Sequence, residues 1–106
     1  MGVTALWTAA HYGIPLLIIV ANNRCFGNSM RHQERLAKQR GRPVENKWIG
    51  TRIDEPLIDM AGTGRIQGLQ GGGPITDLAE LPEALETAIQ AVENGAGYVL
   101  DVVVES

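Results

Sequence analysis

Two predominantly apolar runs are prominent along the chain. They cover Leu16–Ala21 and Tyr98–Val104, both are rich in β-branched residues, and both are far too short to cross a membrane. Runs of this kind are typical of strands buried on both faces of a parallel sheet. The glycine-rich segment at 68–73 predicts a loop around a short third strand.

Three segments have the pattern of a helix. The first is Thr4–Tyr12, where Thr4 is placed to cap the helix and Gly13 to end it. The second is Met30–Arg40, which is amphipathic and highly charged. The third and clearest is Leu81–Glu93, whose apolar residues recur at i, i+3, i+4 and i+7: Leu85, Ala88, Ile89 and Val92.

Two shorter segments are less regular. Phe26–Ser29 is expected to be a loop, with Ser29 as a possible cap for the helix that follows. Asp54 is expected to cap a short helix that has Pro56 in its first turn and a glycine, Gly62 or Gly64, near its end.

The order of these elements predicts the fold class. Helices that alternate with apolar strands indicate an α/β fold, in which a parallel sheet forms the middle of three layers and helices cover both of its faces. A chain of 106 residues is long enough for one such domain. Folds of this class usually open with a strand, so we expect a strand upstream of the first helix.

Charge is distributed very unevenly. Residues 1–23 carry no Asp, Glu, Lys or Arg, all nine Lys and Arg lie between Arg24 and Arg65, and residues 66–106 hold seven acidic residues and no basic ones. The formal net charge of −3 argues against a nucleic-acid binder. The uncharged first block has no obvious solvent face, which indicates an interface or a part of a larger protein. The single cysteine and the lack of a membrane-spanning run are typical of a cytoplasmic protein.

The polar turn after the first apolar run is the main candidate site. Asn22 and Asn23 follow the predicted strand directly, and ligands of open α/β sheets bind beyond the carboxyl ends of the strands. An asparagine side-chain oxygen and a nearby backbone carbonyl are hard, neutral ligands that suit magnesium. The alternative is a plain polar turn without a ligand.

Three pieces of this region carry a family resemblance. They are Leu6-Trp7-Thr8-Ala9-Ala10, then Gly13-Ile14-Pro15, then the apolar strand that ends in Asn22-Asn23. Together they resemble the C-terminal cofactor-binding domain of thiamine-diphosphate-dependent enzymes, in the branch of acetolactate synthase and benzoylformate decarboxylase. The family motif opens with Gly-Asp-Gly roughly thirty residues before Asn-Asn. We therefore expect residues 1–106 to be a partial thiamine-diphosphate-binding domain, truncated at its N-terminus.

The resemblance implies roles for individual residues. Asn23 matches the side-chain ligand of Mg²⁺, and Cys25 matches the position that ligates through its backbone carbonyl. Phe26, Gly27 and Asn28 match the loop beside the diphosphate and the thiazolium ring of thiamine diphosphate. More loosely, Ser29 and Met30 match positions that face the substrate.

The resemblance also implies the chemistry of the whole enzyme. It implies decarboxylation or carboligation of a 2-oxo acid by a lyase or transferase that is a homo-oligomer, a dimer or a tetramer. The motif's aspartate ligand and the glutamate that activates the cofactor are not in this sequence, and no residue here matches a proton-transfer catalyst. We therefore expect these residues alone to be inactive.

Two other functions stay open from the sequence. The first is a non-catalytic α/β fragment that serves as a folding or dimerisation unit, which the uncharged first block favours. The second is a module that binds a phosphorylated ligand at the turn after Ala21. The basic segment Arg31–Arg42 is either a site for an acidic substrate or a solvated helix.

Overall fold

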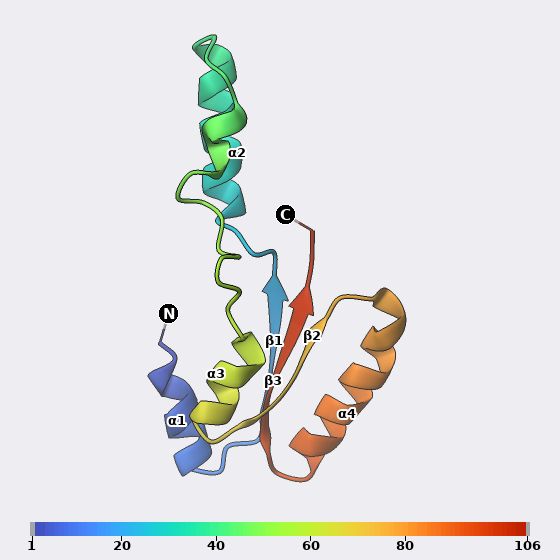
Figure 1. Cartoon of the computed structure of the whole chain (residues 1–106). Helices are drawn as coiled ribbons and strands as arrows, with labels where there is room; N and C mark the ends of the chain where they lie inside the picture. Colours follow the sequence, from blue (N-terminus) through green and yellow to red (C-terminus); the bar gives the residue numbers. More distant parts are fainter. Residues whose placement is uncertain (1, 106) are drawn as a thin grey trace. The chain divides into compact units, whose positions relative to one another are not determined.

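The parallel sheet expected from the two apolar runs is present, and it has a third strand. Figure 1 shows the computed structural model, which describes residues 2–105. The elements in chain order are α1 (Thr4–His11), β1 (Leu16–Asn22), α2 (Gly27–Gln39), the 3₁₀ helix η1 (Glu45–Trp48), α3 (Met60–Ile66), β2 (Gln70–Ile75), the 3₁₀ helix η2 (Leu78–Glu80), α4 (Leu81–Glu93) and β3 (Gly97–Val103).

The described residues form two compact units. The first, here called the sheet unit, consists of the chain up to Asn22 together with Asp59–Val104, and it holds all three strands. The second, here called the helical unit, consists of Asn23–Ile58 together with Glu105, and it holds α2 and η1. The boundary after Asn22 places the predicted cofactor residues in the helical unit.

The strand order in the sheet unit is β1-β3-β2, and both pairs are parallel. The central strand β3 is the most deeply buried, with Val99 2% exposed and Leu100 fully buried. The expectation of a strand buried on both faces is therefore confirmed for the second apolar run. It is wrong for β1, where Ile19 is 52% exposed, because β1 pairs only with β3 among the described strands and lies at an edge.

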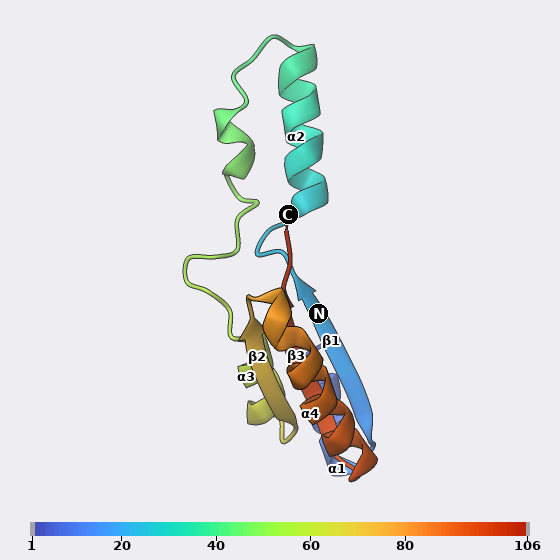
Figure 2. The ribbon, with the colours of Figure 1, turned by 90° about the vertical axis from the view of Figure 1, so that its right-hand side faces the viewer.

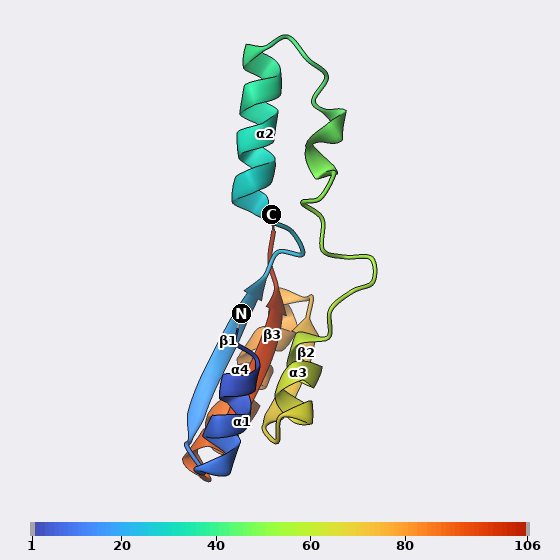
Figure 3. The ribbon, with the colours of Figure 1, turned by 90° about the vertical axis from the view of Figure 1, so that its left-hand side faces the viewer.

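Helices cover both faces of the sheet, which confirms the predicted three layers. Figure 3 shows α1 and α3 in front of the sheet, and Figure 2 shows α4 on the opposite face. Two hydrophobic clusters fill the interfaces. The cluster on the α1 side is centred on Ala9, Leu69 and Val99. The cluster on the α4 side is centred on Ala88, Tyr98 and Leu100.

Two helices of the sheet unit match their predictions closely. α4 has the predicted bounds and ends before Gly95, whose φ of +91° only glycine adopts readily. α1 ends one residue earlier than expected, before Gly13 at φ +62°. Thr4 does not cap α1, because the helix already begins at Thr4 and Val3 occupies the cap position without a side-chain hydrogen bond.

Two predicted helix starts are wrong. Phe26–Ser29 is not a loop, since α2 begins at Gly27 and Ser29 lies in its first turn. Asp54 caps no helix, because its carboxylate is hydrogen-bonded by Arg52 and its backbone forms a bridge with Leu57. The cap of the short helix α3 is Asp59 instead, whose Oδ1 accepts the N–H of Gly62 at 2.8 Å. Within residues 2–105, none of the helices is long and apolar enough to span a membrane.

Candidate functional site

A tight turn follows β1 directly in the chain. The Oδ1 atom of Asn23 accepts the backbone N–H of Cys25 at 3.3 Å. The residue between them, Arg24, has a φ of +57°, a left-handed conformation that few residues other than glycine adopt. The turn therefore places the Asn23 amide next to the backbone of Cys25, and these are the two residues that the family resemblance predicts for the metal site.

A short antiparallel bridge orients the backbone of this turn. Cys25 stands opposite Arg52, and the hydrogen bonds run between their neighbours: Phe26 N–H to Thr51 O at 2.7 Å, and Ile53 N–H to Arg24 O at 2.8 Å. In such a pair the polar groups of the opposed residues point away from the partner segment. The Cys25 carbonyl therefore lies on the same side as its N–H, which is the side where Asn23 Oδ1 sits.

Gly27 lies close beneath the Asn23 side chain. A Cβ atom at position 27 would be 3.2 Å from Nδ2 of Asn23 and 3.7 Å from Sγ of Cys25. The missing side chain thus lets the Asn23 amide pack closely against the first residue of α2, which is buried. The residues on either side of it are open to a ligand, since Phe26 is 58% exposed and Asn28 is also exposed.

The first turn of α2 adds donors to the same region. The cap residue Phe26 makes no side-chain hydrogen bond to the helix, so it does not satisfy the first N–H groups of α2. A helix of 13 residues directs these groups and the positive end of its dipole toward its N-terminus, an arrangement that binds phosphate.

These donors fit a magnesium diphosphate group. The oxygens of Asn23 and Cys25 are hard and neutral, which suits Mg²⁺ when phosphate oxygens and water supply the other positions. Zinc-type sites are a poorer match, because residues 2–105 contain no cluster of three or more His, Cys, Asp or Glu that would hold a metal. The first turn of α2 supplies N–H groups of the kind that bind phosphate.

The electrostatics of the helical unit favour anions. Residues 23–58 carry eight of the nine Lys and Arg against four acidic residues. Two of these acids are neutralised locally. Hydrogen bonds and charge from Lys38 and Lys47 lower the pKa of Glu34, with distances of 3.1 and 3.4 Å. The hydrogen bond from Arg52 lowers the pKa of Asp54 and raises that of Arg52.

The two looser candidates, Ser29 and Met30, lie in different environments, and the two histidines make local contacts on their own helices. Ser29 is exposed in the first turn of α2, whereas Met30 is only 6% exposed and does not present its side chain to solvent. His32 Nδ1 lies 3.1 Å from a guanidinium nitrogen of Arg35, on the exposed side of α2. His11 stacks on Trp7 at a centroid distance of 4.8 Å, so it serves a local aromatic contact.

One polar residue of note was missed as a site candidate. Asp101 of β3 is 2% exposed, and its Oδ2 accepts the side-chain amide of Asn22 at 3.5 Å. Its Oδ1 is buried and has no hydrogen-bond partner among the described residues. A buried carboxylate oxygen is costly without a donor. The signal in the sequence is a single acid within the apolar run Tyr98–Val104.

Comparisons with known proteins bear on this geometry. The family model described as "Thiamine pyrophosphate enzyme, C-terminal TPP binding domain" matches residues 1–102, which is nearly the whole chain. Neither the curated proteins nor the solved structures contain a significant match. The match covers both units, including the turn at Asn23 and the parallel sheet.

Proposed function

Because this chain belongs to the thiamine pyrophosphate enzymes, as a C-terminal TPP-binding domain, we propose that the Asn23–Cys25 turn and the N-terminus of α2 hold the magnesium diphosphate end of thiamine pyrophosphate (thiamine diphosphate, TPP). The observation that carries the proposal is the hydrogen bond from Cys25 N–H to Asn23 Oδ1. That bond holds Asn23 Oδ1 next to the backbone of Cys25, immediately before a helix whose cap residue makes no side-chain hydrogen bond to it.

Each residue of the proposed site has one task. Asn23 supplies Oδ1 to Mg²⁺, and Cys25 supplies its backbone carbonyl, so the thiol needs no role. Gly27 has no side chain that would displace the Asn23 amide, and the N–H groups of the first turn of α2 donate to the diphosphate oxygens. Phe26 and Asn28 are exposed beside Gly27 and line the path toward the thiazolium ring.

The proposed substrate is a 2-oxo acid, and the proposed reaction is decarboxylation or carboligation of the acetolactate synthase and benzoylformate decarboxylase type. When bound, TPP supplies an electron sink for the carbanion that carbon dioxide leaves behind. The residues of this chain bind and orient the cofactor and keep water from it. None of the five site residues carries a side-chain acid or base suited to proton transfer, so we assign no catalytic residue here.

We further propose that the enzyme is a cytoplasmic homo-oligomer, a dimer or a tetramer. Support for association comes from apolar side chains that the sheet unit leaves exposed. On α1 and the segment after it, Trp7 is 54% and Tyr12 72% exposed, and on β1 Ile19 is 52% exposed. Support for a reducing compartment is limited to the single, unpaired cysteine.

Substitution of Asn23 by alanine tests the cofactor site. The Asn23→Ala variant should bind TPP at least about tenfold more weakly in the presence of Mg²⁺, because a metal ligand is lost. The matched control is Asn94→Ala, which removes the same amide group after α4 in the sheet unit. Calorimetric titration with TPP, with and without Mg²⁺, gives both affinities. Equal affinity in the Asn23→Ala variant and the wild-type chain would remove Asn23 from the site.

A further inference from the structure

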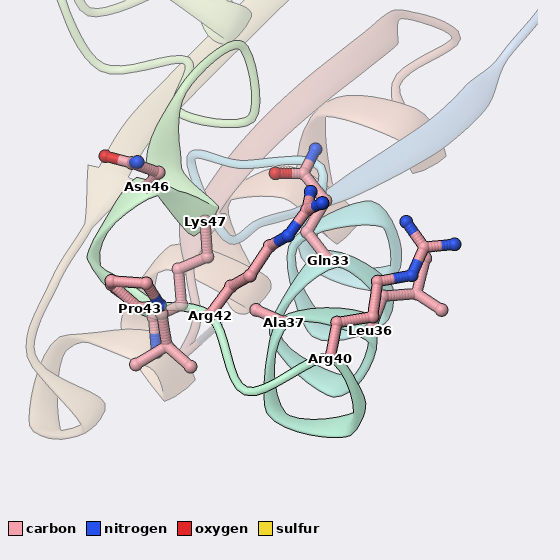
Figure 4. A pocket seen from close by; sticks show the side chains of 9 residues that line it. Gln33, Leu36, Ala37, Arg40, Arg42, Pro43, Asn46 and Lys47 are labelled. Atoms are coloured by element: carbon pink, nitrogen blue, oxygen red, sulfur yellow. The ribbon is translucent and has the colours of Figure 1, made fainter.

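The helical unit contains a cavity that none of the proposed cofactor residues lines. It has a volume of about 340 Å³ and lies between α2 and the segment that carries η1. Figure 4 shows its lining side chains, which come from the second half of α2 and from residues 42–47. A volume of this size lies within the range of small-molecule pockets in proteins.

Three cationic side chains line this cavity. They are Arg40 at the end of α2, Arg42 in the loop that follows, and Lys47 of η1. Figure 4 shows Arg42 extending from the loop toward α2. Neither Arg40 nor Arg42 is paired with a carboxylate among the described residues, whereas Lys47 lies 3.4 Å from Glu34. That carboxylate is also bound by Lys38 at 3.1 Å, so it neutralises Lys47 only in part.

Most of the remaining wall of the cavity is apolar, and the amide side chains of Gln33 and Asn46 complete it. Leu36 and Ala37 of α2 face Pro43 and Val44 of the following segment. A ligand that fits therefore carries concentrated negative charge at one end and a small apolar group at the other. A simple inorganic ion is therefore a poorer ligand for this cavity than an organic anion, because it would make no contact with the apolar part of the wall.

The number of cationic side chains in the cavity favours a phosphate over a carboxylate as the ligand. A carboxylate has one negative charge and two oxygens, which a single arginine satisfies in a bidentate contact. A phosphate monoester carries close to two negative charges at neutral pH and has three terminal oxygens. Two guanidinium groups and one ammonium group match that charge and that number of acceptors.

We propose that this cavity binds a phosphate monoester with a small apolar or planar organic group. The phosphate contacts Arg40, Arg42 and Lys47, and the organic group packs against Leu36 and Val44. This site is separate from the proposed TPP site, because none of Asn23, Cys25, Phe26, Gly27 and Asn28 lines the cavity. Binding at the two sites can therefore be measured independently.

The test is a titration of the wild-type chain with phenyl phosphate, without TPP or Mg²⁺, followed by calorimetry or by backbone amide NMR shifts. We expect saturable binding, with the largest shifts in residues 36–47. Inorganic phosphate should bind more weakly because it lacks the apolar group, and phenol should not bind because it lacks the charge. The Arg42→Gln variant should lose at least about tenfold in affinity, since it loses charged hydrogen bonds.

The matched control is Arg31→Gln, on the same helix and of the same charge change but about 13 Å away along the helix axis from Arg40. Its affinity for phenyl phosphate should change less than twofold. An equal loss of affinity for phenyl phosphate in the Arg31→Gln and Arg42→Gln variants would show general charge attraction, and it would overturn the proposal. Benzoate binding more tightly than phenyl phosphate, or no saturable binding of phenyl phosphate by the wild-type chain, would overturn it as well. Arg40→Gln gives a second, independent variant at the same cavity.

Discussion

Among single residues, Gly27 is the position where adding one methyl group would test the geometry of the proposed site. A Cβ atom there would lie 3.2 Å from Nδ2 of Asn23, closer than most side-chain contacts in proteins. The Asn23 amide would have to move by a few tenths of an ångström. Such a movement disturbs the metal ligand while leaving the helix intact, so binding and stability are expected to change separately.

We predict that Gly27→Ala weakens the affinity for TPP in the presence of Mg²⁺ several-fold. The free energy of unfolding should stay the same or rise slightly, since alanine favours the helix more than glycine does. Calorimetric titration gives the affinity, and urea denaturation gives the stability. Gln39→Ala, at the other end of the same helix, is the control. Unchanged affinity in Gly27→Ala would mean that the Asn23 amide does not need its observed position.

At this scale the sequence predicted the identities of the candidate residues but not their arrangement. The pair Asn22-Asn23 after an apolar strand predicted a polar turn, and the family resemblance was needed to predict an oxygen ligand at Asn23. The left-handed φ of Arg24 and the bridge between Cys25 and Arg52 could not be predicted, because the bridge joins segments far apart in the chain. Asp101 was also missed, since a lone acid in an apolar run shows its burial only once its neighbours are placed.

Among the secondary-structure elements, the packing of α3 against the sheet depends on a glycine. A Cβ atom at Gly64 would lie 2.7 Å from Cγ2 of Val99, which is buried in the central strand. Gly64 itself is buried, so neither group can turn toward solvent. The close approach of this short helix to β3 therefore excludes every larger side chain at position 64.

We predict that Gly64→Ala lowers the free energy of unfolding by about 1–3 kcal/mol, the usual cost of overpacking a core. Urea denaturation followed by circular dichroism measures the change. Ile66→Ala is the control on the same helix, because Ile66 is 78% exposed and its removal should change stability by less than about 0.5 kcal/mol. Helix propensity alone predicts stabilisation by Gly64→Ala, so a gain in stability would contradict the close packing.

The predictions of helices and strands succeeded where the signals lie close together in the sequence. Leu81–Glu93 was predicted with its observed bounds because periodicity, Pro82 and the following glycine all agree. The start of α3 was wrong because Asp54 and Asp59 are both suitable caps by type. The choice between them is made by the contact of Asp54 with Arg52 and by the bridge to Leu57.

For the whole molecule, the exposed edge of the sheet is the feature with the largest consequence for assembly. The side chain of Ile19 lies on the sheet face that α4 covers, yet it is 52% exposed because α4 packs mainly against the other two strands. Figure 2 shows β1 extending beyond the edge of α4. An exposed apolar strand at a sheet edge favours association with another chain.

We predict that the wild-type chain self-associates and that Ile19→Lys weakens this association by at least about tenfold, since a charge would enter the apolar contact. Analytical ultracentrifugation over a range of concentrations measures the change. The control is Ile66→Lys, which places the same charge on an exposed position of α3. A wild-type chain that remains monomeric at every concentration would contradict the proposed oligomer.

The central position of β3 has a consequence for the synthesis of the protein. β3 is the last described strand in the chain, and β1 and β2 are joined only through it. As the ribosome makes this polypeptide from the N-terminus at about 5–20 residues per second, β1 emerges several seconds before its described partner β3. The apolar segment Leu16–Ala21 is therefore exposed to chaperones and to other nascent chains throughout that interval.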